Sequence, residues 1–218
     1  MEQEIDYKGY RIRIKRIDYP DSPKEWDNNG AFLVYNHRSF LVDVEDFNVD
    51  DIADYLQSLA HPNDEYDVRD FSDYYIFPVE AYIHSGISLS LCNGTKTCPW
   101  DSSVSGYILV DKKNELIQGT EFVTESMAKE RAKDLLKLWN QYLSGEVYGF
   151  IIQKPDIYYQ ISKEKFDKEL LEGTTIRDLE SKFDIAHNWI DIDSCWGYYG
   201  DPEESGCIEE AKSIIDNL

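Results

Sequence analysis

The chain has 218 residues, of which 42% are hydrophobic and 14% aromatic, and its formal net charge at pH 7 is −21. This composition predicts a folded protein, and the charge argues against direct binding to nucleic acid or to an anionic membrane surface. No run of residues reaches the roughly 20 apolar positions of a transmembrane helix. The acidic start MEQEIDYKGY also lacks the apolar region of a signal peptide. We therefore expect a cytoplasmic protein with cationic partners.

Two segments carry nearly all of the excess acid. Residues 41–80 hold twelve acids and a single base, Arg69, and residues 161–218 hold fifteen acids and six bases. Acidity that served only solubility would be spread more evenly, although two solvated segments would give the same pattern.

The N-terminal part of the chain predicts strands joined by loops. Residues 10–17 alternate basic and apolar side chains, which is typical of a half-exposed strand. We interpret its basic run RIRIKR (11–16) as a salt-bridged sheet edge that resists pairing with another sheet. Residues 18–30 form a loop rich in Pro, Asp, Asn and Gly, and residues 31–35 and 39–44 then form a hairpin.

The first expected helix covers residues 48–60. Asn48 is a suitable N-cap, and Asp50 and Asp51 fall in the first turn, where the helix dipole favours carboxylates.

The middle of the chain predicts more strands. Residues 74–91 read as one strand or two, interrupted at Pro78 and at residues 85–86. A polar loop follows over residues 93–106, and residues 107–111 (YILVD) form a further strand.

The clearest predicted element is a long helix over residues 124–143, which Gly145 ends. Its apolar face is formed by four side chains at helical spacing: Leu135, Leu138, Trp139 and Tyr142.

After this helix, the sequence predicts a strand over residues 146–153, two short helices over 162–173 and 175–184, a strand over 188–200 and a last helix over 208–218. Strands come in adjacent pairs and helices gather late, which favours an α+β fold. The predicted fold class is therefore α+β, with an antiparallel sheet, a long helix and several short C-terminal helices. We expect a single domain over residues 1–218, with a possible helical insertion over 154–187.

The cysteines predict no metal site. Cys92, Cys98, Cys195 and Cys207 do not match the ligand spacings of zinc sites, and in a reducing compartment they are thiols. We expect no cofactor.

Several motifs resemble those of a family of small acidic proteins carried by phages, plasmids and conjugative elements. They are SPKEWDNNGAF, YIHSGISLSL with CPWDSSVSGYILV, YLSGEVYGF and DSCWGYYG. This chain has Ser103 where the family pattern has a glycine after Trp-Asp-Ser. The resemblance implies a counter-defence setting, in which acidic proteins inhibit restriction enzymes or CRISPR nucleases by imitating DNA.

The first functional hypothesis is such an inhibitor, which would bind the cationic nucleic-acid-binding surface of a host nuclease. Carboxylates along one face would replace DNA phosphates, and tyrosines would anchor the interface. The residues expected to bind the partner are Asp43, Glu45, Asp46, Asp50, Asp51, Asp54, Asp64, Glu65, Tyr66, Asp67, Asp70, Asp73 and Tyr74.

The alternative hypothesis is a metal- or small-ligand-binding protein, or an enzyme, with a polar pocket. His84 would be its base, oriented by Asp101 or Asp193, and Trp100 and Trp196 would complete the pocket. The simpler explanation is that the tryptophans anchor Asp-Ser turns in the core and that His84 is held within a turn.

Overall fold

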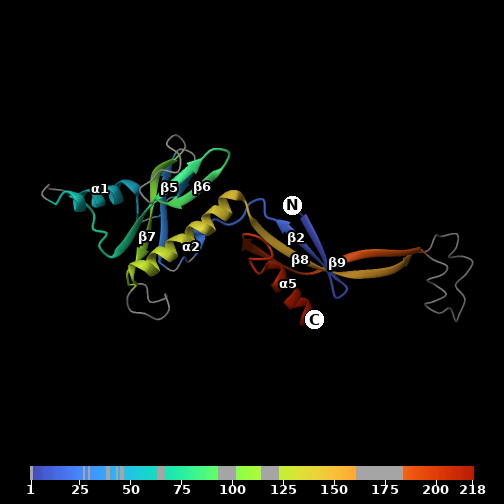
Figure 1. Ribbon diagram of the computed structural model, residues 1–218. Helices are drawn as coiled ribbons and strands as arrows, with labels where there is room; N and C mark the ends of the chain where they lie inside the picture. Colours follow the sequence, from blue (N-terminus) through green and yellow to red (C-terminus); the bar gives the residue numbers. More distant parts are fainter. Residues whose placement is uncertain are drawn as a thin grey trace, which may run out of the picture. The chain divides into compact units, whose positions relative to one another are not determined.

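A computed structural model describes residues 2–26, 28, 30–37, 40–42, 44, 47–62, 67–92, 102–113, 123–160 and 184–218. The chain forms two compact units (Figure 1). Unit 1 comprises Met1–Ile17 and Val147–Leu218, and unit 2 comprises Asp18–Glu146. Unit 2 is thus one continuous segment inserted into unit 1. The Ile17 N–H donates to the Val147 carbonyl oxygen over 2.8 Å, where the chain leaves and re-enters unit 1.

Unit 2 is built on a five-stranded sheet in which all neighbouring strands are antiparallel. The strand order is β4-β3-β7-β5-β6, so β4 and β6 are the edges. The strands are β3 (Ala31–His37), β4 (Phe40–Val42), β5 (Tyr74–Ile83), β6 (Ile87–Leu91) and β7 (Ser102–Asp111).

Both faces of this sheet are covered, because its central strands are apolar on both sides. In β3, Leu33 and Tyr35 pack on the face that helix α2 (Glu125–Ser144) covers. Val34 between them packs on the other face, in a cluster with Ile52 of helix α1 (Val49–Ala60). A short 3₁₀ turn, η1 (Pro23–Glu25), precedes β3.

Asn48 and Gly145 confirm the predicted start of α1 and end of α2, whereas the cap at Thr124 was not predicted. The Asn48 side chain accepts from the Asp51 N–H at the start of α1, and Thr124 accepts from the Met127 N–H at the start of α2. Gly145 ends α2 with φ 70°, a left-handed conformation that glycine adopts without a Cβ penalty.

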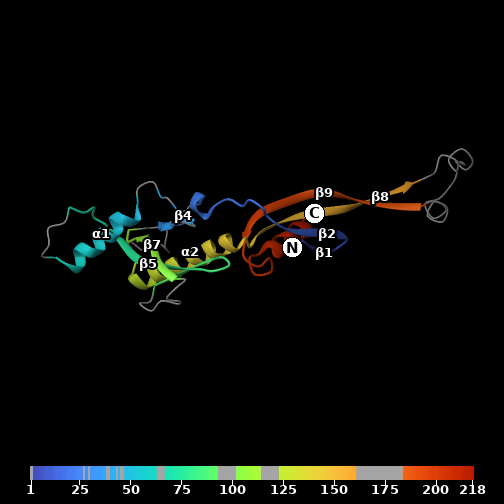
Figure 2. The same ribbon diagram turned by 90° about the horizontal axis from the view of Figure 1, so that it is seen from above.

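Unit 1 holds a second antiparallel sheet, in the order β1-β2-β8-β9. Helix α5 (Cys207–Asp216) packs on it through a cluster that includes Ile12, Phe150 and Ile208. β8 and β9 run on as a two-stranded hairpin beyond the shorter β1 and β2 (Figures 1 and 2). The strands are β1 (Glu2–Tyr7), β2 (Tyr10–Arg16), β8 (Val147–Gln160) and β9 (Asp184–Tyr199).

The predicted fold class is wrong. The structure is built mainly on two separate antiparallel sheets, rather than on one sheet with a long helix and several short C-terminal helices. The described part of residues 147–218 has one helix, α5, and is dominated by the β8–β9 hairpin. The short helices predicted over 162–173 and 175–184 lie outside the described residues, except for Asp184, which begins β9. The flanks of the expected insertion, 154–160 and 184–187, are strand.

Three strand predictions also need correction. β1 was missed, and because it pairs outside β2, the basic run of β2 lies inside the sheet rather than at its edge. β7 begins at Ser102, within the predicted loop. β5 continues through Pro78, where an interruption was predicted. Proline has no N–H to donate, but this position lies beside the end of β6, and the Pro78 carbonyl oxygen still accepts from the Cys92 N–H over 2.8 Å.

We predict that Gly106→Ala destabilises unit 2 by about 1–3 kcal/mol, the usual cost of overpacking. A Cβ at Gly106 would lie 2.6 Å from the Tyr35 ring and 2.6 Å from the Val34 carbonyl oxygen. Urea unfolding measures the change. Gly86→Ala is the matched control, since nothing lies within 4 Å of its added Cβ. Equal unfolding midpoints for the two variants would contradict the close approach at Gly106.

Candidate functional site

The N-terminal turn of α1 carries the best-defined part of the acidic surface. Asp51 has a structural role, because its N–H donates to Asn48 Oδ1 and its carboxylate accepts from Asn48 Nδ2, both over 2.7 Å. Asp50 and Asp54 are exposed and make no hydrogen bond or ion pair within the part of the chain that the structure describes. Ile52 between them is fully buried and fixes which side of the helix faces solvent.

The segment after α1 has three exposed acids, of which two have polar partners in the described chain. Asp70 accepts from the Ser72 N–H (2.8 Å) and hydroxyl (2.9 Å), and these hydrogen bonds lower the pKa of the Asp70 carboxyl. Asp73 forms an ion pair of 2.8 Å with Lys113. Asp67 is exposed, with no polar partner among the described residues.

The aromatic residues of this region are packed into the protein. Tyr74 is half-buried, and its ring meets the Phe47 ring edge-on at 5.4 Å between centroids. The Arg69 guanidinium lies 5.4 Å from the ring centroids of both Phe47 and Phe71. Tyr74 is thus a core contact in this structure.

Apart from Tyr74, which packs on Phe47, the predicted partner-binding residues therefore fall into three groups. Asp50, Asp54 and Asp67 are exposed without a polar partner in the described chain, whereas Asp51, Asp70 and Asp73 have structural partners. The remaining predicted residues lie outside the described residues: Asp43, Glu45, Asp46, Asp64, Glu65 and Tyr66.

The residues of the alternative pocket are divided between the two units. His84 is exposed in the β5–β6 turn of unit 2, with its ring 6.3 Å from that of Tyr82. Asp193 and Trp196 lie on β9 of unit 1, and Trp100 and Asp101 lie outside the described residues. Trp196 is 47% exposed and packs on Gly149 of β8, so it anchors no buried turn.

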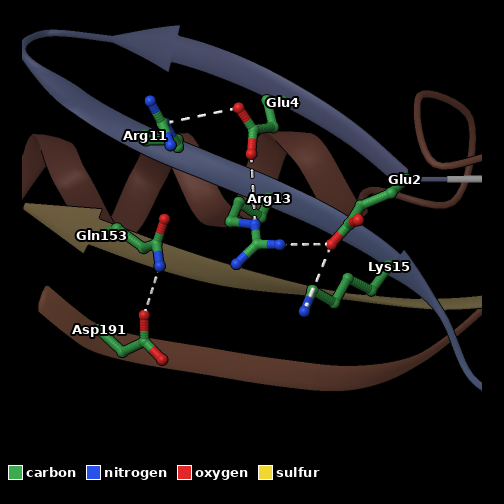
Figure 3. A network of polar contacts seen from close by, with 7 residues as sticks. All are labelled: Glu2, Glu4, Arg11, Arg13, Lys15, Gln153 and Asp191. Atoms are coloured by element: carbon green, nitrogen blue, oxygen red, sulfur yellow. Dashed lines mark hydrogen bonds and ion pairs between the residues drawn. The ribbon is translucent and has the colours of Figure 1, made fainter. Parts of the chain in front are cut away.

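Acidic residues of β1 pair with the basic run of β2 (Figure 3). Arg13 contacts Glu2 over 2.6 Å and Glu4 over 3.4 Å. Lys15 reaches Glu2 over 3.3 Å and Arg11 reaches Glu4 over 3.6 Å. The salt bridging expected of this run is thus present, although β2 is an inner strand. Such exposed pairs each contribute about 1 kcal/mol or less.

The second acidic block is exposed at the start of α5. Glu209 and Glu210 lie in its first turn, where the helix dipole favours them. Asp201 accepts from the Glu203 N–H over 2.8 Å, and Glu204 beside it is exposed.

Two thiols and a phenol come together under α5. Cys207 is fully buried, and burial, with Cys195 and Glu210 nearby, raises the pKa of its thiol to about 12. Burial, followed by the same two neighbours, also raises the pKa of Tyr198 above its ordinary value. The elevated pKa of Cys207 opposes thiolate formation, so Cys207 is unsuited to nucleophilic chemistry.

Unit 2 contains a groove of about 680 Å³ between β6 and α2 that the sequence did not reveal. Its apolar side chains include Leu89 of the strand and Leu136 of the helix. Three exposed lysines, Lys129, Lys133 and Lys137, follow one another along α2 beside it. Their spacing of four residues was visible in the sequence, but the neighbouring strand edge was not.

Among the described residues, no group of three or more histidine, cysteine, aspartate or glutamate side chains is placed to hold a metal ion. Within the same residues, no helix has the length and apolar character needed to cross a membrane.

Comparison with known proteins gives little information on family. No protein-family model and no solved structure matches the chain. A segment of 91 residues, 40% of the chain, is 28% identical to the ATP-dependent zinc metalloprotease FtsH of Helicobacter pylori. The match covers 14% of that protein, which is too little to show the family.

We predict that the stability of unit 1 falls as the pH rises from about 8.5, the ordinary thiol pKa, towards about 12, the folded pKa of Cys207. Over this range the unfolded chain releases the proton and the folded chain keeps it, which costs up to about 1.4 kcal/mol per pH unit. Urea midpoints at several pH values measure this loss. Cys207→Ala should reduce the pH dependence, whereas Cys92→Ala in unit 2 should not. Identical pH profiles for Cys207→Ala and the unaltered protein would contradict the assignment.

Proposed function

We propose that this protein is an anti-defence protein of a phage or mobile element. It binds the cationic nucleic-acid-binding surface of a host restriction enzyme or CRISPR nuclease and excludes DNA by imitating its charge. The observation that carries this proposal is the set of exposed acids Asp50, Asp54 and Asp67, which make no polar contact within the described chain. Carboxylates without internal partners are available to a cationic partner.

The charge density of α1 resembles that of DNA. A helix rises about 1.5 Å per residue, so Asp50, Asp51 and Asp54 place three carboxylates along about 6 Å of axis. One DNA strand carries a charge about every 3.4 Å. Lysines and arginines spaced to hold phosphates along a strand would therefore meet carboxylates at a comparable spacing.

The surroundings of α1 hold these charges in place. The buried Ile52 and the caps formed by Asn48 fix the rotation and start of the helix. A carboxylate array that is already ordered loses less conformational entropy on binding than a flexible acidic tail would.

The proposed partner is a protein and not a nucleic acid. At a net charge of −21 the chain repels phosphate. The proposed inhibition needs no cofactor and no catalysis. The protein would act in the cytoplasm of the host cell. Oppositely charged surfaces speed association and make it sensitive to salt.

The test is to measure inhibition of DNA binding by a panel of purified restriction enzymes and CRISPR nucleases at about 50 mM and about 500 mM salt. We expect inhibition of one enzyme class at low salt and its loss at high salt, as the Debye length shortens. The triple variant Asp50→Asn, Asp54→Asn, Asp67→Asn should weaken that inhibition about tenfold or more.

The matched control removes three exposed acids elsewhere in unit 2: Asp18→Asn, Glu25→Gln, Asp134→Asn. It should inhibit as the unaltered protein does, and circular dichroism should show both variants folded. Inhibition of no enzyme on the panel would contradict the proposal, as would an equal loss in both variants.

A further inference from the structure

The outer edge of β6 carries backbone groups that pair with no other strand in the described part of the chain. The Leu89 N–H points away from β5 and donates to Asn140 Oδ1 over 2.7 Å, while Asn140 Nδ2 donates to the Leu89 carbonyl oxygen over 2.8 Å. The Cys92 N–H points the other way, to Pro78 of β5. Backbone groups alternate along an antiparallel strand, so Ile87 and Leu91 also present their N–H and C=O groups at the outer edge.

The Asn140 carboxamide occupies the place that a peptide group of a neighbouring strand would take. It supplies one donor and one acceptor to the same residue, as a paired strand does. An added strand would replace these two hydrogen bonds one for one and gain new ones at Ile87 and Leu91. The exchange at Leu89 is therefore close to neutral, and the flanking positions favour the added strand.

The lysines of α2 define the charge of a suitable strand. Lys129, Lys133 and Lys137 stand at intervals of four residues, which is about 6 Å along a helix. Alternate residues of an extended strand are about 6.7 Å apart and point to the same face. Acidic residues at alternate positions of a strand would thus match the lysine spacing. Lys129 and Lys137 have no acidic partner in the described chain, and Lys133 pairs with Glu130 at 2.6 Å.

We propose that the groove between β6 and α2 binds an extended acidic peptide segment of a partner protein, added as a strand to β6 with its acidic side chains against Lys129, Lys133 and Lys137. This surface is distinct from the acidic face of α1 and does not depend on the function proposed above. The net charge of −21 slows the approach of an acidic peptide. At about 0.15 M salt the Debye length is about 8 Å, so a peptide already in the groove responds mainly to the charges that line it, which are the three lysines and Glu146.

The probe is a fluorescein-labelled octapeptide of alternating glutamate and threonine, titrated with the full chain at about 0.15 M salt and followed by fluorescence anisotropy. We expect saturable binding, and shifts of the Ile87, Leu89 and Leu91 amides in ¹H–¹⁵N NMR spectra. Lys129→Glu with Lys137→Glu should weaken binding about tenfold or more. The matched control is Lys24→Glu with Lys154→Glu, which reverses two exposed lysines outside the groove and should bind as the unaltered chain does.

Two further peptides, each N-methylated along one of its two edges, separate strand addition from simple charge attraction. N-methylation of alternate residues removes the backbone N–H donors along one edge of the peptide and leaves every charge in place. The peptide whose methylated edge would face β6 should therefore lose binding, and the other should keep it. Overturning results are no saturable binding, equal weakening by both lysine variants, or undiminished binding of both N-methylated peptides. A concentration-dependent dimer of the chain that Lys129→Glu with Lys137→Glu dissociates would also overturn the proposal, since a second copy would then fill the groove.

Discussion

The organisation of unit 2 depends on the burial of both faces of its central strands. β3 and β7 carry consecutive apolar residues, such as Ile108, Leu109 and Val110, all fully buried. A strand of this kind cannot leave either face in water, so one helix must cover each side. The same constraint sets the positions of both proposed binding surfaces. α1 directs its acidic turn to solvent from one face, and α2 lies across the other face with its lysines beside β6.

Charge in this protein has two different uses that composition alone cannot separate. Some acids are part of the fold, as when Asp51 completes a helix cap and Glu2 and Glu4 hold β1 to β2. Others, such as Asp50 and Asp54, are exposed to water and have no polar partner within the described chain, and the helix dipole favours Asp50 in the first turn. Acids of the second kind give up no polar contact within the described residues when they bind a partner, which makes them the better candidates for recognition.

The sequence predicted what local chemistry determines and missed what distant pairing determines. Helices α1 and α2 were found because caps and a 3.6-residue period lie within a few residues of each other. β1 was missed, since the alternation of Glu2, Glu4 and Asp6 has meaning only beside the bases of β2. The division into two sheets was invisible because β2 pairs with β8, whose residues follow the whole of unit 2. For the candidate site, the acidic region was predicted from the sequence. The hydrogen bonds and ion pairs that some of its carboxylates make within the protein were not.

The two ends of unit 2 lie close together, because Ile17 donates a hydrogen bond to Val147 at the point where β2 pairs with β8. A segment whose two ends meet on adjacent strands of a host sheet can be replaced by a short turn, or exchanged for another segment, without changing the order of that sheet. The sheet of unit 1 would then close as an ordinary meander from β1 to β9.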